Sequence, residues 1–259
     1  MNLVLFGDNF GIPLLLKFIP HEYIKTIVAA SIRPNYIDEI KQFADSIGSN
    51  FIIQPKFNSR EYPSFVEHFK QSQFDLLMCN SYSMIIRPEI LAIINYNAIN
   101  VHGALLPKNR GPNPNQWSII KGETKTGVTI HFIEDGLDCG DIISQKEVDI
   151  DFKDTWVSLS DKVKSTTHDL LKEKLFNILT GNFNRTKQNE EFATINKRLN
   201  SESPRIDFEK MDDMEIYNLI RAQVIPLKGA YIKINKDRVY YPEFIEYNEI
   251  KEIRKKYAK

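Results

Sequence analysis

Five short apolar runs in the first 102 residues are separated by segments with helical spacing, and this alternation constrains the fold more than any other feature. The runs cover residues 2–7, 23–31, 49–54, 74–80 and 98–102. In the connecting segments, apolar residues recur three or four positions apart, as on the buried face of an amphipathic helix. Such a chain builds a doubly wound, mostly parallel sheet with helices on both faces. We therefore predict an α/β, Rossmann-like fold.

The pattern changes in the second half of the chain. Residues 127–133 and 141–150 alternate polar and apolar side chains like two antiparallel strands, and residues 155–179 have the apolar spacing of one long helix. A polar, loop-like segment follows this helix. We therefore predict a large domain over residues 1–183 and a small C-terminal α+β extension over residues 184–259.

The predicted extension contains a helix over residues 211–224, strands over 229–236 and 238–245, and a final amphipathic helix. The two strands should form a hairpin across residues 235–237. An isolated two-stranded hairpin is marginally stable in water, and its edges invite pairing with another strand. We expect the matching hairpin of a second subunit to cover it, which predicts a homodimer. Packing onto the helix at 155–179 is the alternative.

Composition narrows the possible partners. The chain has 34 Lys and Arg residues and 34 Asp and Glu residues, so its formal net charge is zero. Nucleic-acid-binding proteins usually carry a basic surplus, so we expect no nucleic-acid partner. No stretch approaches the ~20 apolar residues of a membrane span and no signal peptide is recognisable, which predicts a cytoplasmic protein without a membrane partner. The two cysteines, Cys79 and Cys139, lack the spacing of a disulfide framework or zinc site.

An Asn and a His lie two residues apart where the fifth run ends. Side chains at positions i and i+2 of a strand share one face, so Asn100 and His102 should project together. Ligands of doubly wound sheets bind beyond the carboxyl ends of the strands. A loop with Arg110 follows directly, and Asp138, between two later strands, can return to the same place. The three side chains could divide the work of acyl transfer, although an Asn-x-His pair alone also fits a polar strand terminus.

Other possible motifs fail on spacing. Residues 7–11, Gly-Asp-Asn-Phe-Gly, do not match the GxGxxG pattern of a dinucleotide site. Asp135, Asp138 and Asp141 are three residues apart, which differs from the ligand order of a calcium-binding EF-hand loop, and we expect no metal. His131 lies inside a predicted strand, where a packing or edge role is favoured over a functional one.

Three segments of the chain carry a resemblance to a known enzyme family. They are NVHGALLPKNRGPNP at 100–114, GETKTGVTIHFIEDGLDCGDII at 122–143 and DTWVSL at 154–159. Together they resemble the formyltransferases that use 10-formyltetrahydrofolate, over roughly residues 1–180. The resemblance implies the formyltransferase fold and transfer of a formyl group from 10-formyltetrahydrofolate to an amine.

The resemblance also implies roles for individual residues. Asn100 would stabilise the oxyanion, His102 would relay protons, and Asp138 would orient His102. The folate-binding residues would form two walls: Met84, Ile85 and Ile86 after the fourth strand, and Glu134, Asp135, Gly136, Leu137 and Asp138 between the two later strands. Pro112 departs from the pattern, because some family members have an Arg at that position.

The amine substrate is predicted from the C-terminal part of the chain. Methionyl-tRNA formyltransferases resemble the N-terminal half but end in an OB-type barrel, and five strands fit poorly into the 59 residues after Asn200. The segment NLIRAQVIPLKGAY at 218–231 resembles nucleotide-sugar N-formyltransferases instead. We therefore expect a dTDP-linked amino-dideoxy sugar, dTDP-4-amino-4,6-dideoxyglucose, used for O-antigen or other surface polysaccharide. A truncated methionyl-tRNA formyltransferase is the alternative, and a folate-binding regulator without catalysis conflicts with the intact Asn, His and Asp.

Three residues are expected to contact this sugar nucleotide, because they follow the first and fourth predicted strands at the edge where substrates bind. They are Phe10, Asn80 and Tyr82. The substrate would then approach opposite the folate, across Asn100 and His102.

Overall fold

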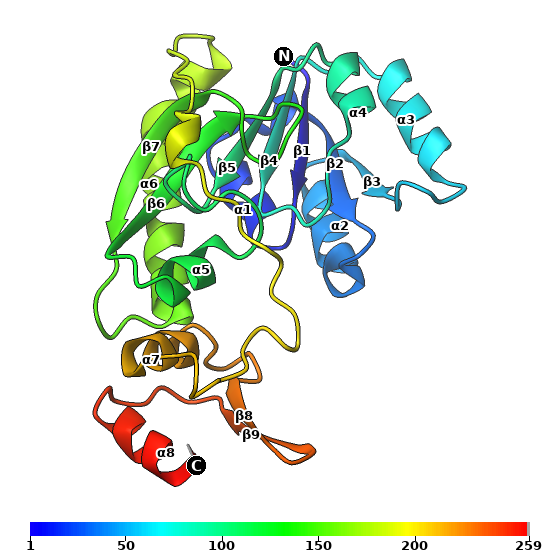
Figure 1. The fold of residues 1–259 in the computed structure, drawn as a ribbon. Coiled ribbons are helices and arrows are strands. Elements are labelled where there is room, and N and C mark those ends of the chain that lie inside the picture. Colours follow the sequence, from blue (N-terminus) through cyan, green and yellow to red (C-terminus); the bar gives the residue numbers. More distant parts are fainter. Residues whose placement is uncertain (258–259) are drawn as a thin grey trace. The chain divides into compact units, whose positions relative to one another are not determined.

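A computed structural model describes residues 1–257, and its central element is a seven-stranded sheet (Figure 1). The strand order is β3-β2-β1-β4-β5-β6-β7. The strands are β1 (Leu3–Gly7), β2 (Ile24–Ala30), β3 (Asn50–Gln54), β4 (Leu76–Asn80), β5 (Ala98–His102), β6 (Lys125–Phe132) and β7 (Ile142–Asp149). Strands β1 to β5 pair in parallel, and β6 is antiparallel to β5. The mostly parallel α/β sheet predicted from the sequence is therefore confirmed.

Helices connect these strands and follow them. They are α1 (Gly11–Leu16), α2 (Ile37–Ser46), α3 (Tyr62–Gln71), α4 (Pro88–Ile93), α5 (Pro114–Ile120) and α6 (Trp156–Leu179), with single 3-10 turns at His21–Tyr23, Pro34–Tyr36 and Glu190–Phe192. Helix α1 contacts β1 and β4, α2 contacts β2 and β3, and α3 packs on α4. Within residues 1–257, no helix combines the length and apolar character needed to cross a bilayer.

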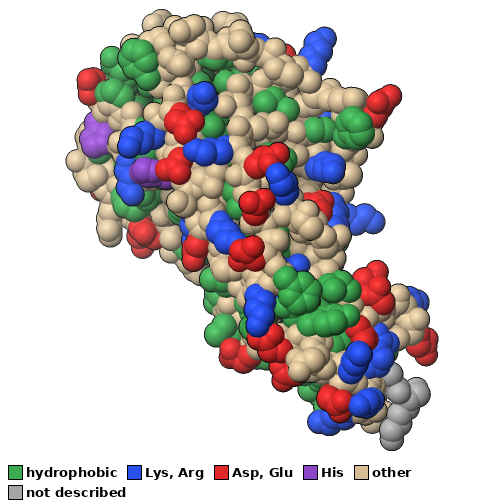
Figure 2. All heavy atoms as spheres, turned by 90° about the vertical axis from the view of Figure 1, so that its left-hand side faces the viewer, with side chains coloured by type: hydrophobic (Ala, Val, Ile, Leu, Met, Phe, Trp, Pro, Cys, Tyr) green, Lys and Arg blue, Asp and Glu red, His purple; other side chains and the backbone are tan. Residues whose placement is uncertain are grey.

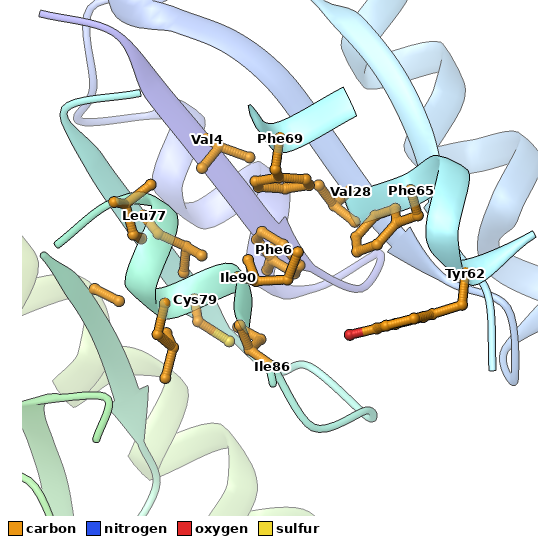
Figure 3. Packing of buried hydrophobic residues seen from close by; sticks show 13 residues of the cluster. Val4, Phe6, Val28, Tyr62, Phe65, Phe69, Leu77, Cys79, Ile86 and Ile90 are labelled. Atoms are coloured by element: carbon orange, nitrogen blue, oxygen red, sulfur yellow. The ribbon is translucent and has the colours of Figure 1, made fainter. Parts of the chain in front are cut away.

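The central strands β1 and β4 are buried because both of their faces are covered. All five residues of β1 are buried, and so are all five of β4. Alternate residues of β1, Val4 and Phe6, point into a cluster with Phe65 and Phe69 of α3 and Ile90 of α4 (Figure 3). This continuous burial explains why the strands read as unbroken apolar runs, which is the pattern of parallel sheets.

The strand order reverses between β1 and β4, which pair with each other in the interior of the sheet. From β1 the sheet continues to β2 and β3, and from β4 it continues to β5 and β6 in the opposite direction. At such a switch point the loops that follow neighbouring strands diverge and leave a crevice for ligands. The carboxyl ends of β1, β4 and β5 are therefore where a ligand site is expected.

The chain divides into two compact units that interleave along the sequence. The first unit contains Met1–His102, Thr129–Gln145 and His168–Gln188, and the second contains Gly103–Val128, Lys146–Thr167 and the residues from Asn189 onward. Strands β6 and β7 and helix α6 run from one unit into the other. This division differs from the linear boundary expected after residue 183, which stays a prediction.

The C-terminal residues of the second unit have a hydrophobic core of their own. They form α7 (Asp213–Arg221), β8 (Ala230–Ile234), β9 (Asp237–Tyr241) and α8 (Glu249–Tyr257). A capping box starts α7: Asp212 accepts from the backbone of Glu215, and Glu215 accepts from that of Asp212. Ile216 and Ile220 of α7 and Ile250 of α8 pack with Ala230 and Ile232 of β8.

The predicted hairpin is present, with shorter strands and a tighter turn than expected. Strands β8 and β9 pair antiparallel, and Ile234 faces Asp237 across a two-residue turn. Asn235 in that turn has a φ of 55°, a left-handed conformation that asparagine tolerates better than most residues. Helices α7 and α8 cover Ile232, so much of the apolar surface that motivated the homodimer is buried inside one chain.

Candidate active site

Asn100 and His102 lie at the carboxyl end of β5, on the same side of that strand. Asn100 stands opposite Cys79 on one neighbouring strand and opposite His131 on the other, while His102 stands opposite Thr129. The His102 side chain is 8% exposed. The strand pairing on both sides therefore fixes the direction in which the amide and the imidazole project.

Asp138 reaches the same place from the loop between β6 and β7. Its Oδ2 lies 3.6 Å from Nδ1 of His102, and its side chain is 17% exposed. The backbone of Asp138 has a φ of 48°, a left-handed conformation that aspartate tolerates better than most residues. Non-glycine residues held in this region cluster at functional sites. The structure thus brings together His102 and Asp138, 36 residues apart in the sequence.

The loop that carries Asp138 is fastened at both ends. The Phe132 amide donates to the carbonyl of Asp141 at 2.9 Å, which closes the loop onto the end of β6. The side-chain amide of Gln188 donates to the carbonyls of Asp138 and Gly140, each at 2.8 Å. These bonds hold the backbone at the aspartate, so the carboxylate is presented to the site from a fixed support.

A second histidine, His131 on β6, also belongs to this cluster. Its Nε2 lies 3.2 Å from Nδ2 of Asn100 and 3.7 Å from Oδ1 of Asp138, and its Nδ1 lies 2.8 Å from the carbonyl oxygen of Phe132. The sequence favoured a packing role for His131, and the structure adds polar contacts with two predicted site residues. The pairing register of β5 with β6 places His131 opposite Asn100, and knowledge of this register would have identified His131 as a site residue.

The two predicted folate walls differ in exposure. Ile86 is buried in the core cluster, whereas Ile85 is 68% exposed and its carbonyl accepts from the Gln54 side chain at 3.0 Å. Met84 is half-buried and accepts a weak hydrogen bond from Ser31 at its sulfur. The second wall, residues 134–137, is exposed. A ligand in contact with these residues would meet the exposed apolar side chains of Ile85 and Leu137, part of Met84, and several backbone groups.

Among the residues expected to bind the substrate amine, Tyr82 is engaged within the protein. Its hydroxyl donates to Oε1 of Gln54 at 2.8 Å, and its ring packs edge-on against Phe6 at 5.1 Å. Burial raises the pKa of its phenol well above the ordinary value, so the hydroxyl stays protonated. Phe10, at the start of α1, is half-buried, and its backbone amide donates to the Asp8 carboxylate at 3.0 Å.

Asn80 differs from these two residues. It ends β4, its side chain is only 3% exposed, and its Nδ2 has no hydrogen-bond partner among the residues that the structure describes. A buried amide without a partner costs free energy, about 1–3 kcal/mol, unless a ligand or water supplies the acceptor. The unsatisfied donor therefore marks this strand end as a place where a polar group of a ligand can bind.

Two further groups near the strand ends limit the chemistry of the site. Burial raises the pKa of the Cys79 thiol, and the carboxylates of Asp138 and Asp8 add to that rise, so the thiol is neutral and a poor nucleophile. Burial also raises the pKa of Asp8, although the backbone amides of Gly11 and Phe10 donate to it and oppose the shift. Within residues 1–257, no group of three His, Cys, Asp or Glu side chains could hold a metal ion.

The basic loop after β5 belongs to the second unit. Arg110 is 4% exposed, and its two terminal nitrogens donate to the Glu190 carboxylate at 2.9 and 2.7 Å. This bidentate pair lowers the pKa of Glu190 and neutralises the charge of the guanidinium. Pro112, where the sequence departs from the family pattern, is half-buried.

The site as a whole is equipped for acyl transfer. Asn100 offers an amide donor, and His102 offers an imidazole that can take and return a proton. Asp138 places a carboxylate near Nδ1 of that imidazole. The buried Cys79 thiol beside them is neutral, so it is a poor nucleophile. The arrangement therefore suits direct attack by a substrate amine on an activated acyl group.

Comparison with known proteins agrees with this chemistry. Residues 21–175 match the family described as formyl transferase. Over 252 residues the chain is 32% identical to the methionyl-tRNA formyltransferase of Fusobacterium nucleatum subsp. nucleatum, an alignment that covers 92% of this chain and 80% of the relative.

Solved structures share the fold over most of the chain. A sugar N-formyltransferase from Shewanella sp. FDAARGOS_354 superimposes with a TM-score of 0.76 at 23% identity, covering 95% of this chain and 98% of that one. The N-formyltransferase from Helicobacter canadensis, solved with folinic acid and dTDP-3-aminofucose, gives a TM-score of 0.68 at 20% identity and covers 92% and 86%. At these identities the likeness establishes the fold.

Proposed function

The chain belongs to the formyl transferase family and is a folate-dependent formyltransferase, and on that premise we propose that its acceptor is an amino sugar. The enzyme would transfer the formyl group of 10-formyltetrahydrofolate to the amine of a dTDP-linked amino-dideoxy sugar. The specific acceptor we propose is dTDP-4-amino-4,6-dideoxyglucose. Its formylated product would enter O-antigen or another surface polysaccharide.

The observation that carries the mechanism is the contact between His102 and Asp138 beside Asn100. The neutral amine attacks the formyl carbon, and the carbonyl electrons move onto oxygen as the new C–N bond forms. The Asn100 amide donates to this oxyanion. His102 takes a proton from the attacking nitrogen and supplies one to the folate nitrogen as the old C–N bond breaks. Asp138, whose Oδ2 lies 3.6 Å from Nδ1, orients the imidazole.

The C-terminal part of the chain supports a sugar acceptor. Residues 213–257 form a helix, a two-stranded hairpin and a second helix around their own core. The solved sugar N-formyltransferase from Shewanella matches this chain along 98% of its own length. Figure 2 shows Lys and Arg side chains interspersed with Asp and Glu on the face drawn, whereas RNA-binding surfaces are usually dominated by basic residues.

Methionyl-tRNA formylation is the second candidate, and one observation favours it. The chain is 32% identical to a curated methionyl-tRNA formyltransferase, a higher identity than to the sugar enzymes compared above. The two candidates share the folate site and the catalytic residues. They differ only in the amine that reaches the formyl carbon.

A direct transfer assay separates the two candidates. Purified enzyme with a formyl donor labelled in the formyl carbon would be offered dTDP-4-amino-4,6-dideoxyglucose, the corresponding 3-amino sugar, or methionyl initiator tRNA. We expect label in the dTDP-sugar fraction, with kcat/KM for the 4-amino sugar exceeding that for the tRNA. Label only in the tRNA would replace the proposal with its alternative, and label only in the 3-amino sugar would correct the ring position.

We also propose that the sugar nucleotide contacts Asn80, together with Phe10 and Tyr82. The support is strongest for Asn80, whose buried Nδ2 lacks a partner within residues 1–257. An Asn80→Ala variant should raise KM for the amine by about 10-fold, as expected for one lost hydrogen bond of about 1.5 kcal/mol. The dissociation constant of the folate should not change. A KM equal to that of the wild type would show that Asn80 does not contact the sugar nucleotide.

Homodimer formation is a further part of the proposal. Ile234 and Tyr240 of the hairpin remain 37% and 39% exposed, and Ile225 is 51% exposed, so apolar surface is left for a partner. We expect sedimentation at micromolar concentration to show a species of twice the 30.1 kDa chain mass. A species at the chain mass would indicate a monomer, in which α7 and α8 are sufficient to cover the apolar surface of the hairpin.

A further inference from the structure

We propose that His131 is a positioning residue that fixes which end of the Asn100 side-chain amide faces the reacting formyl group. The inference rests on the proposed role of Asn100 as the oxyanion donor. The key contact belongs to His131, for which the sequence favoured a packing role. Its Nε2 lies 3.2 Å from Nδ2 of Asn100. An asparagine amide can turn by 180° and exchange its NH2 for its oxygen, so a donor at this position needs something to hold its orientation.

The hydrogen-bond roles follow from one fixed acceptor. Nδ1 of His131 lies 2.8 Å from the carbonyl oxygen of Phe132, and a carbonyl oxygen can only accept. Nδ1 must therefore carry the proton. In a neutral imidazole, Nε2 then has a lone pair and can only accept, so Asn100 must present its NH2 group to it. The backbone carbonyl of Phe132 thus determines the orientation of Asn100 through the imidazole.

This orientation has a direct consequence for the oxyanion. An NH2 group has two N–H bonds, so with one donated to His131 the other can be directed at the formyl oxygen. If the amide were reversed, its oxygen would stand where the donor is needed and would repel the developing negative charge. Transition-state stabilisation of this kind depends on donors that are oriented before the reaction starts. His131 would supply that orientation without contacting either substrate.

The same tautomer separates the roles of the two histidines around Asp138. Oδ1 of Asp138 lies 3.7 Å from Nε2 of His131, and Oδ2 lies 3.6 Å from Nδ1 of His102. Because Nε2 of neutral His131 has no proton to donate, it does not compete for the carboxylate, which is left to orient His102. The two rings stand at 88° to each other with centroids 6.2 Å apart, so neither stacks on the other.

A purely structural role for His131 makes different predictions. The residue is 1% exposed, and replacing it could simply disturb the packing of β6. Lost packing would lower the melting temperature together with kcat, whereas the proposed role depends on an acceptor at the position of Nε2 and should leave the melting temperature unchanged. Two polar substitutions separate these possibilities. In His131→Gln the longer side chain can place an oxygen near the Nε2 position, and in His131→Asn the side chain is too short to do so.

Steady-state kinetics on these two variants test the proposal. We expect His131→Asn to lower kcat by about 10- to 100-fold, less than the ~10²–10³-fold loss of an oxyanion donor itself. KM for the amine, the folate dissociation constant and the melting temperature should stay close to those of the wild type. His131→Gln should recover most of kcat. Equal kcat losses in both variants, or wild-type kcat in both, would overturn the proposal.

The coupling between the two residues gives a second kinetic test. If His131 acts through Asn100, adding His131→Asn to an Asn100→Ala enzyme should lower kcat by no more than about twofold, because the group it orients is already gone. Multiplication of the two single losses would show an independent role and would refute positioning through Asn100.

The tautomer of His131 can be measured without turnover, so this test does not depend on which amine the enzyme formylates. Long-range proton–nitrogen NMR of the nitrogen-15-labelled wild-type protein at neutral pH should show that His131 is protonated at Nδ1 and unprotonated at Nε2. A proton on Nε2 would overturn the inference whichever amine the enzyme formylates. If the tautomer and the variant kinetics are as expected but the dTDP-sugar is not a substrate, only the proposed acceptor fails.

Discussion

Replacing His102 with Ala should lower kcat by about 10²–10⁴-fold, the contribution expected of a positioned general acid–base group. His102 is proposed to move protons between the attacking amine and the leaving folate nitrogen. Asp138 lies at its Nδ1, at 3.6 Å, which leaves the opposite side of the ring for the reactants. The loss should appear in single-turnover formyl transfer, because the chemical step itself is slowed.

Folding and folate binding should survive this change. His102 is the last residue of β5, and the pairing of that strand with β4 and β6 uses backbone groups that an alanine retains. The melting temperature and the folate dissociation constant should therefore stay near wild-type values. His21→Ala is a matched control, since His21 is exposed in a 3-10 turn of the same unit, and it should leave kcat unchanged.

The other two proposed catalytic residues extend this prediction. Asn100→Ala should cost about 10²–10³-fold in kcat, as loss of one oxyanion donor does elsewhere. Asp138→Asn keeps the shape of the side chain and removes its charge, so kcat should fall while the loop stays in place. Near-normal turnover in His102→Ala would show that another group carries the proton, and the assignment of all three roles would have to be revised.

The sequence was sufficient to predict the features that depend on local pattern. Unbroken apolar runs predict parallel strands because such strands are buried on both faces, as all residues of β1 and β4 are. The shared face of Asn100 and His102 follows from the two-residue period of a strand. Both inferences need only residues that are close together in the chain.

The features that the sequence did not predict depend on register and tertiary packing. The role of His131 arises because β5 pairs with β6 so that His131 stands opposite Asn100, and nothing local to either strand sets that register. The hairpin illustrates the same limit, because its own residues do not indicate which helices cover Ile232, and the homodimer stays a prediction. In the structure, α7 and α8 pack on Ile232 within the chain.

The same limit applies to the predicted substrate contacts. Asn80 and Tyr82 are two residues apart and looked equivalent in the sequence. In the structure the Tyr82 hydroxyl donates to Gln54, whereas Asn80 keeps a buried donor without a partner within residues 1–257. Which of two neighbouring polar residues is satisfied depends on what the fold brings beside it, here a glutamine from the end of β3.

Replacing Gly140 with Ala should lower both activity and stability, because the new methyl group has no space. A Cβ at this position would lie 2.1 Å from the carbonyl oxygen of Phe132 and 2.8 Å from its carbonyl carbon. Both atoms belong to the backbone of β6, so they cannot rotate away as a side chain could. The loop must instead retreat from the strand, which would weaken the bond from the Phe132 amide to Asp141 and the bonds that Gln188 donates.

Retreat of this loop should displace the Asp138 carboxylate, which is proposed to orient His102. Asp138 is two residues before Gly140, and its 3.6 Å approach to His102 depends on the same backbone. A displacement of about 1 Å at a reacting group can cost about 10²-fold in rate, so kcat should fall by about that factor. Overpacking of this kind typically costs about 1–3 kcal/mol of stability, measurable as a lower midpoint of urea unfolding.

Gly181→Ala separates the effect on the site from a general cost of replacing a glycine. Gly181 lies in the same unit, has a φ of 73°, and has no atom within 4 Å of where a Cβ would be. Its replacement should cost about 1 kcal/mol through backbone strain alone, with kcat unchanged. If Gly140→Ala also kept its kcat and lost only stability, Asp138 would not depend on the closure of this loop. The carboxylate would then have to be held at His102 by other contacts.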